Sequence, residues 1–186
     1  MTLPVFCVNG VLNGLNGGIV SEILTPQNGD DSRDDRPRLV LDTNTVLALW
    51  MFRDPKLEAL REWIEAGNCR LCSRPDALDE LRSVLAYRQF ALNEASQQHI
   101  HAHFESLLPR PDDRLEWIAS EKLISLPRCQ DADDQKFLEI ALLDQATHLL
   151  TRDKALLKLA RHRAIRDRFM ILTPERFVSP PPWSRS

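Results

Sequence analysis

The chain has 186 residues, 43% of them apolar, which is enough for one domain with a single sizeable core. Its net charge of -3 and pI near 6.0 exclude a surface that is basic all over, although a local basic patch for nucleic acid stays open. No run approaches the roughly 18 apolar residues of a membrane span, and no secretory signal opens the sequence, so we expect a cytoplasmic protein without membrane contact.

The segment 1–37 is predicted to be an appended arm and not part of the core. Five of the six glycines lie there, together with the acidic, turn-rich stretch "NGDDSRDDRP". At the other end, residues 179–186, "SPPPWSRS", are typical of a polyproline-like tail. The sequence therefore predicts one folded domain over residues 38–178, with a partly flexible arm before it and a Pro-rich tail after it.

Between these ends, short apolar runs alternate with helical segments. Strands are predicted in "RLVLDTN", "CRLCS", "THLLTRD" and "MILTP", with a further short strand near the end of "WIASEKLISL". Helices are predicted over residues 54–68, 74–90, 92–108, 131–146 and 154–169. The first should stop near Gly67, and Ser73 with Asp76 forms a capping signal for the second. This alternation predicts an α/β fold, a three-layer α/β/α sandwich around a central, mainly parallel sheet.

Two of the predicted strands end near a carboxylate. Asp42 follows the run "RLVL", and Asp153 comes shortly after "HLL". The carboxyl ends of parallel strands meet at one edge of a sheet, where ligands bind in folds of this kind. An unpaired ionised carboxylate is costly to bury, so these side chains should either accept hydrogen bonds or hold a cation. Asn44 and the hydroxyl of Thr151 are close enough in sequence to support them.

Helical phase selects two further carboxylates. On the helix over 74–90, Asp79 lies opposite the apolar stripe, whereas Glu80 lies at its flank and is the better candidate to face a site. On the helix over 131–146, Asp134 shares the apolar face, where a carboxylate is hard to explain without a cation. Asp131 is expected to be the N-cap of this helix, which explains its carboxylate without a functional role.

The four selected carboxylates supply only oxygen donors. They are Asp42, Glu80, Asp134 and Asp153, with support expected from Asn44, Thr151 and Asp131. No His or Cys is among them, so the set suits Mg²⁺ or Mn²⁺ better than Zn²⁺. A magnesium ion held by a few carboxylates keeps some of its waters and most often acts on phosphate oxygens. The sequence therefore points to phosphate chemistry at the predicted sheet edge.

Five stretches together resemble a known family. They are "LVLDTNTVL", "ALDELRSVL", "DADDQKFLEIAL", "HLLTRDKALL" and "ILTPERF", and in this order they resemble the PIN-domain proteins that are toxin components of bacterial toxin–antitoxin systems. The resemblance spans about residues 38–177. It implies a Mg²⁺- or Mn²⁺-dependent ribonuclease with a parallel sheet flanked by helices, and it puts the family's acidic set on the same four carboxylates. It also implies a small antitoxin protein as partner and a homodimer.

The chain departs from the family pattern at two places. The family often has Asp-Pro-Asp-Asp where this chain has Asp131-Ala132-Asp133-Asp134, and often Gly where this chain has Arg152. Neither change removes a carboxylate. The second alters the shape expected at the entry for substrate.

The resemblance and the oxygen donors together predict metal-assisted hydrolysis of an RNA phosphodiester. Asp42, Asp134 and Asp153 would bind one or two cations, and Glu80 would complete the shell or orient the attacking water as a base. Asn44 would hold Asp42 or a phosphate oxygen by hydrogen bonds. By the resemblance, the products would carry a 5′-phosphate and a 3′-hydroxyl.

A basic segment follows the last of these carboxylates. Residues 152–168 contain seven Lys and Arg side chains against two Asp. The nearest to the site, which we expect to grip the RNA backbone, are Arg152, Lys154, Lys158 and Arg161. The alternative, which carries equal weight, is that these residues form a solvated helix face, as runs of charged residues usually do.

Two other functions are weighed against the nuclease. A strand followed by Asp-Thr-Asn-Thr is similar to the start of haloacid-dehalogenase-type phosphatases, but those place a second Asp two residues after the first, where this chain has Asn44. The other alternative is a catalytically silent PIN fold that only binds RNA or a partner. The intact acidic residues argue against it.

Overall fold

In a computed structural model of the protein, residues 35–109 and 126–178 are described. The C-terminal tail, most of the N-terminal arm and most of the segment in which the extra short strand is predicted lie outside these ranges. The described residues belong to a compact unit that begins at Asp35. None of the helices in the described ranges is long and apolar enough to cross a bilayer.

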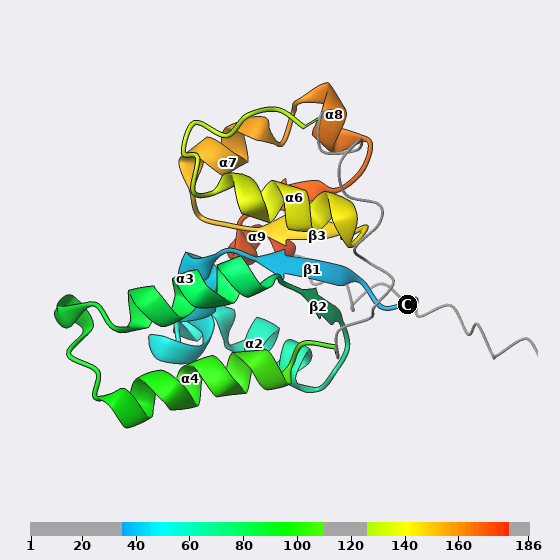
Figure 1. The fold of residues 1–186 in the computed structure, drawn as a ribbon. Helices are drawn as coiled ribbons and strands as arrows, with labels where there is room; N and C mark the ends of the chain where they lie inside the picture. The colour runs from blue at the N-terminus through cyan, green and yellow to red at the C-terminus, as the bar shows by residue number, and fades with distance from the viewer. Residues whose placement is uncertain (1–34, 110–125, 179–186) are drawn as a thin grey trace, which may run out of the picture. The chain divides into compact units, whose positions relative to one another are not determined.

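The centre of this unit is a sheet whose four described strands all run parallel (Figure 1). The strands are β1 (Arg38–Leu41), β2 (Arg70–Cys72), β3 (His148–Leu150) and β4 (Met170–Leu172). Their order is β2-β1-β3-β4, and Val40 of β1 pairs with Cys72 on one side and Leu149 on the other. Four of the five predicted strands and their parallel arrangement are therefore confirmed, and the fifth falls largely outside the described residues.

Helices lie between the strands along the chain. They are α1 (Thr43–Val46), the π-helical turn η1 (Leu47–Met51), the 3₁₀ turn η2 (Pro55–Leu57), α2 (Glu58–Glu65), α3 (Pro75–Leu85), the 3₁₀ turn η3 (Arg88–Phe90), α4 (Glu94–Ser106), α6 (Gln135–Leu143), α7 (Lys154–Leu159), α8 (Arg163–Arg166) and α9 (Pro174–Phe177). α2 ends at Glu65, close to Gly67 as predicted, and the φ of 75° at Gly67 favours glycine.

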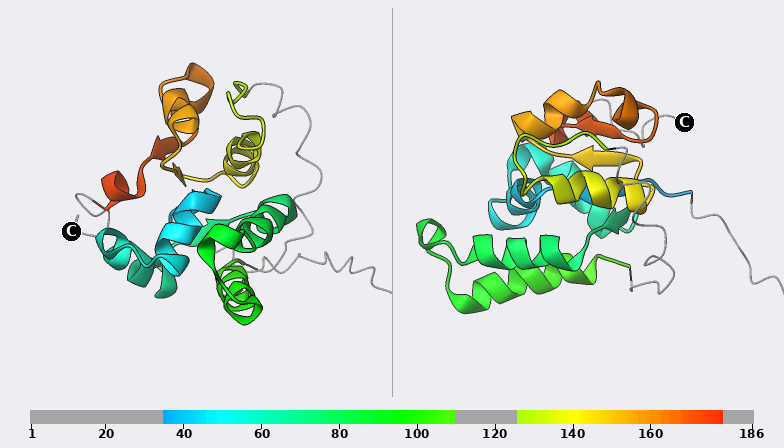
Figure 2. Two further views of the ribbon diagram at one scale, coloured as in Figure 1. Left: turned by 90° about the vertical axis from the view of Figure 1, so that its left-hand side faces the viewer. Right: turned by 45° about the horizontal axis from the view of Figure 1, so that its top comes forward.

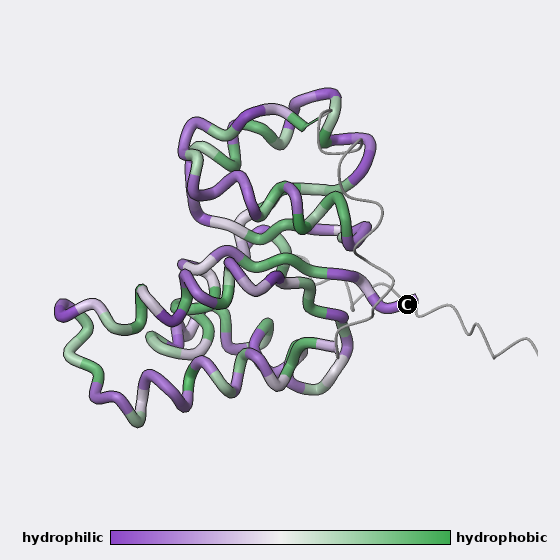
Figure 3. The backbone as a smooth tube through the Cα atoms, in the orientation of Figure 1, coloured by the Kyte–Doolittle hydropathy of each residue, from purple (hydrophilic) through white to green (hydrophobic). Residues whose placement is uncertain are grey.

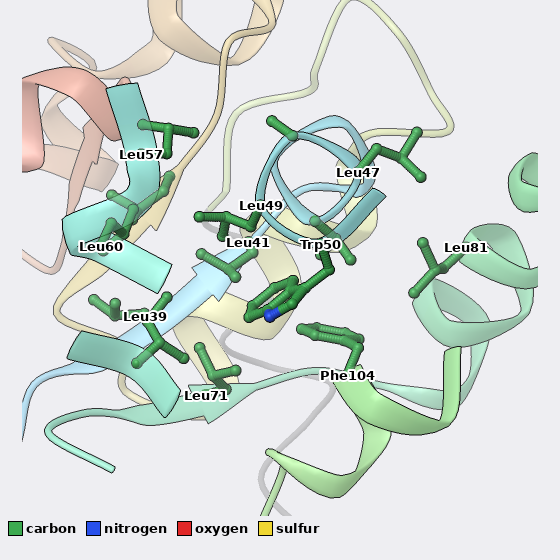
Figure 4. Close-up of a cluster of buried hydrophobic side chains, with 14 of the residues drawn as sticks. Leu39, Leu41, Leu47, Leu49, Trp50, Leu57, Leu60, Leu71, Leu81 and Phe104 are labelled. Carbon is green, nitrogen blue, oxygen red and sulfur yellow. The ribbon is translucent and has the colours of Figure 1, made fainter. Parts of the chain in front are cut away.

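Each strand buries side chains on both faces, which makes the fold three-layered. Leu39 and Leu41 of β1 point into one core with η1, α2 and α4, and in this core the rings of Trp50 and Phe104 lie 5.6 Å apart (Figure 4). Val40 points the opposite way into a second core with α6, α7 and α8. The strands are accordingly among the most hydrophobic stretches of the backbone (Figure 3). The predicted α/β/α sandwich is confirmed.

The start of α3 differs from the prediction. Ser73 does not cap this helix, because the N-cap position is taken by Arg74 and its side chain makes no capping hydrogen bond. Pro75 occupies the first helical position, which its fixed φ favours, and this moves the boundary one residue beyond Ser73. Asp76 instead forms two hydrogen bonds with the guanidinium of Arg74.

The predicted helix over 154–169 is broken into α7 and α8. Leu156 and Ile165 are both fully buried, yet they are nine residues apart, which is about half a turn out of phase on one helix at 100° per residue. A single helix could not bury both against the same core. His162 begins the second helix by accepting a hydrogen bond from the Ala164 amide at 3.2 Å.

Candidate active site

The strand order creates a switch point between β1 and β3. The chain passes from β1 to its neighbour β2 on one side and then crosses to β3 on the other side. In open parallel sheets, ligands bind beyond the carboxyl ends of the strands at such a point. Figure 2 (left) looks onto this edge, where α1, α3, α6 and α7 surround the ends of β1 and β3.

Asp42 is fixed at the end of β1. Its side chain is only 3% exposed and caps α1, accepting a hydrogen bond from the Thr45 amide at 2.6 Å. The hydroxyl of Thr151 donates to the other carboxylate oxygen. Burial raises the pKa of Asp42, and these hydrogen bonds partly offset that rise. The carboxylate at the end of the buried strand is therefore held by the first turn of α1 and by the residue that follows β3.

Asp153 is fixed in the same way after β3. It caps α7, accepting hydrogen bonds from the Ala155 amide at 2.6 Å and the Leu156 amide at 3.1 Å. Its own amide donates to the Thr151 hydroxyl oxygen at 2.9 Å. Thr151 thus links Asp42 to Asp153 and holds the two strand ends in register.

Glu80 reaches the site from α3. One of its carboxylate oxygens accepts a hydrogen bond from the Thr43 hydroxyl at 2.7 Å, which brings it to the start of α1. The other oxygen lies 2.5 Å from the ammonium of Lys136, on α6. Asp79, one position earlier, is exposed, as the helical phase predicts. Sequence reasoning missed Thr43 and Lys136, since neither lies in a motif that implies a carboxylate partner.

Asp134 shows most directly that the carboxylates converge. Its pKa is raised to about 6, first by burial and then by the negative charges of Asp153, Asp131, Asp42 and Glu80. Four further carboxylates therefore lie within electrostatic range of one side chain. The four residues selected from the sequence are brought to one edge of the sheet.

The prediction that Asp131 caps α6 is wrong. The N-cap position belongs to Asp134, whose side chain makes no capping hydrogen bond, and the helix begins at Gln135. Asp131 accepts instead from the Asp133 amide at 3.0 Å, a local turn that competes with helix formation over 131–134. Asp134 consequently precedes the helix, and its carboxylate is left to face the other acidic residues.

Asn44 is placed differently from its two threonine neighbours. Its side chain is exposed on α1, whereas Thr43 and Thr45 are buried. The hydrogen bonds to Asp42 come from Thr45 and Thr151. A contact between Asn44 and a phosphate oxygen stays a prediction.

The donor set fits a hard divalent cation in its chemistry. It consists of carboxylate oxygens, and the raised pKa values of Asp42 and Asp134 reflect burial and mutual repulsion that a cation would relieve. As the side chains stand, however, the described residues contain no group of three or more His, Cys, Asp or Glu side chains that could hold a metal ion. The oxygens of Glu80 are already engaged by Thr43 and Lys136.

The basic residues near this edge fall into two groups. The Arg152 guanidinium is held by Asp54 at 2.6 Å and by Glu175, whose closest oxygen lies 2.5 Å away. Lys154, Lys158 and Arg161 are exposed, and no ion pair is formed by any of them within the described ranges. Lys154 is the first residue of α7 and directly follows Asp153. Arg152 therefore clips the end of β3 to α9, while the other three project cations into solvent.

A comparison with protein families identifies the fold family of the chain. A family model for the PIN domain matches residues 38–155, more than half of the chain. The match begins at the first residue of β1, ends in the first turn of α7, and includes all four carboxylates. No curated protein matches the chain.

Proposed function

The chain belongs to the PIN-domain family, a superfamily of nucleases, and from this membership we propose that it is a Mg²⁺- or Mn²⁺-dependent endoribonuclease. Toxins are frequent in this superfamily, so the proposal includes a role as the toxin of a toxin–antitoxin pair. Its partners would then be RNA and a neutralising antitoxin protein, and the protein would act as a cytoplasmic homodimer.

One observation carries this proposal. Asp42, Glu80 and Asp153 come from three separate parts of the chain, yet Thr151 hydrogen-bonds both Asp42 and the Asp153 amide, and Glu80 accepts from Thr43, the residue after Asp42. Burial and then the charges of these three carboxylates raise the pKa of Asp134. A fold has little reason to gather carboxylates at a ligand-binding edge unless a cation or proton is to be shared there. The oxygen donors favour Mg²⁺ or Mn²⁺.

The four carboxylates are expected to have different roles because their side chains are held in different ways. Asp42 and Asp153 are fixed by hydrogen bonds from backbone amides and Thr151, so they would hold the cation rigidly. Asp134 makes no hydrogen bond through its side chain within the described ranges and is free to bind as well. A bound divalent ion would supply charge neutralisation on the phosphate and a more acidic water. Glu80 would complete the shell or orient that water as a base.

Two alternatives have less support. The phosphatase reading needs an acid two residues after Asp42, and Asn44 has no carboxyl group to donate a proton. A silent RNA-binding or partner-binding module needs no clustered carboxylates, yet burial and like charges hold the pKa of Asp134 near 6. Such a costly cluster favours a cation-dependent function.

We expect the purified full-length chain to cut single-stranded RNA with Mn²⁺ or Mg²⁺ and to stop when EDTA removes the ion. The products should carry a 5′-phosphate and a 3′-hydroxyl, which enzymatic end-labelling distinguishes. If the protein bound RNA in a filter assay but did not cleave it, the catalytically silent module would be favoured. Release of phosphate from p-nitrophenyl phosphate would favour the phosphatase.

The cations on α7 lead to a second expected result. Lys154→Ala should weaken RNA binding and reduce the slope of log K against log salt by about 0.7, the value for one phosphate contact on a single strand. Arg152→Ala should leave that slope nearly unchanged, because its guanidinium is already held by Asp54 and Glu175. Binding is measured by fluorescence anisotropy across a salt series with Ca²⁺ in place of Mg²⁺.

If wild type and Lys154→Ala showed equal salt slopes, Lys154 on α7 would not contact the RNA backbone. The basic run would then be a solvated helix face. Lys158→Ala provides an independent check, because this residue lies one turn along α7 on the same face as Lys154.

A further inference from the structure

Lys136 lies inside the acidic site. Its ammonium is 2.5 Å from a Glu80 oxygen, and the two side chains are only 17% and 27% exposed. The second Glu80 oxygen accepts from Thr43 at 2.7 Å, so both oxygens are engaged. Among the described residues, this is the ion pair that joins a cation to one of the four site carboxylates.

The surroundings give the ammonium a task beyond this one pair. Asp134 lies two residues earlier in the chain, and burial followed by the charges of Asp153, Asp42 and Glu80 raises its pKa. The pKa of Asp76, at the start of α3, is lowered first by its hydrogen bonds with Arg74, and the charge of Lys136 adds a smaller lowering. The ammonium on α6 therefore acts on two carboxylates of α3, Glu80 and Asp76.

The other cation beside Asp76 is committed to different carboxylates. Arg74 is paired with Asp76 at 2.7 Å and Glu139 at 3.0 Å. The Lys136 ammonium also lies over the ring of Phe137, with its nitrogen 5.9 Å from the ring centroid. Packing and charge together hold the ammonium at Glu80.

We propose that Lys136 is a built-in counter-ion that occupies the Glu80 arm of the site in the cation-free protein and gives it up when a divalent cation binds. The inference rests on the proposed function. The ammonium and the Thr43 hydroxyl hold both oxygens of Glu80, so a divalent cation can take the ammonium-bound oxygen only if Lys136 leaves it. Lys136 is thus a positioning residue that acts through Glu80.

The exchange has a direct functional consequence. When a divalent cation binds the Glu80 oxygen, the Lys136 ammonium moves away from that oxygen, and no covalent bond forms or breaks. The released Lys136 side chain then adds a positive charge to the edge where an RNA phosphate would lie. Cation binding and phosphate binding would be coupled through one side chain.

Mn²⁺ binding by calorimetry tests the inference without any reference to cleavage. Lys136→Met keeps the aliphatic stem beside Phe137 and removes the charge, so it should tighten Mn²⁺ binding by roughly tenfold. In a Glu80→Gln background, Lys136→Met should leave the Mn²⁺ affinity unchanged, because Lys136 then has no Glu80 carboxylate to release. Lys154→Met also removes a charge near the site, and it should change the affinity by less than about threefold.

The sign of the effect separates this role from a structural one. A residue needed only to hold the site together would weaken Mn²⁺ binding when replaced, and that result would overturn the inference. Equal tightening in Lys136→Met and Lys154→Met, or an effect that persists in the Glu80→Gln background, would also overturn it. A loss of folding in the Met variant is detected by its melting curve, and Lys136→Gln then replaces it.

The outcome for wild type distinguishes this inference from the proposed function. If neither wild type nor Lys136→Met binds Mn²⁺, the metal-dependent function and the counter-ion role fail together. If wild type binds Mn²⁺ and cuts RNA but Lys136→Met binds no more tightly, the counter-ion role alone fails.

Discussion

Asp42→Asn is expected to reduce RNA cleavage by roughly 10²–10³-fold while leaving the protein as stable as wild type or more stable. The loss follows because the substitution removes one negative oxygen from the proposed cation site. Stability is kept because Asn can still accept from the Thr45 amide and can donate to the Thr151 oxygen. Cleavage of a short labelled RNA and the melting temperature measure the two effects.

The raised pKa of Asp42 gives this prediction a pH dependence. In the folded protein, burial raises the pKa above its value in the unfolded chain, so the folded state holds the proton more tightly. The stabilisation from that proton is present at low pH and is lost as pH rises through the folded pKa. Wild type should therefore lose stability relative to Asp42→Asn as pH increases, as measured by urea unfolding across a pH series.

Asp79→Asn is the matched control for this variant. Asp79 lies beside Glu80 in sequence, but it is exposed and pairs with Arg82 at 2.7 Å, away from the site. Its replacement should leave cleavage within about twofold of wild type, because exposed ion pairs contribute little. Full activity in Asp42→Asn would contradict the assignment of Asp42 to the cation site.

The parts of the fold that were predictable follow from apolar periodicity. Short apolar runs fixed where the strands lie, and a carboxylate after β1 or β3 must lie at the carboxyl edge of a parallel sheet. Helical phase separated exposed Asp79 from Glu80, which turns toward α1 and hydrogen-bonds Thr43. Each of these inferences depends on one repeating geometry.

Besides the helix over 154–169, which is broken in two, the wrong predictions concern contacts between neighbouring residues at helix starts. Asp131 and Ser73 both have side chains that favour an N-cap, but the local turn at Asp131 and Pro75 at the first position of α3 moved the caps to other residues. Cap preference is worth only about 1 kcal/mol, so such competing local terms decide the boundary.

The pair of Lys136 and Glu80 could not be predicted from sequence. The two residues are 56 positions apart, and their contact depends on how α3 and α6 approach each other across the end of β1. Sequence periodicity places each residue on a face of its own helix. It does not determine which charged side chains meet across two helices.

Asp153 is expected to have two separable roles, and two substitutions should separate them. Asp153→Ala should lose roughly 10²–10³-fold in cleavage and about 1 kcal/mol of stability, because it removes both a proposed cation ligand and the cap of α7. Asp153→Asn should lose cleavage to a similar extent yet keep most of the stability, since Asn is as good an N-cap as Asp. RNA cleavage and urea unfolding measure the two losses.

Thr173→Ala supplies the complementary control. Thr173 caps α9, accepting from the Arg176 amide at 3.3 Å, and it is not one of the proposed cation ligands. Its replacement should cost stability comparable to Asp153→Ala, about 1 kcal/mol, while cleavage is retained. If Thr173→Ala abolished cleavage as well, loss of a helix cap alone would explain the Asp153→Ala result, and Asp153→Asn, which keeps the cap, would have to decide; suppose this variant then cleaved RNA as wild type does. The negative charge of Asp153, which Asn lacks and the cap does not need, would then have no separate role in catalysis.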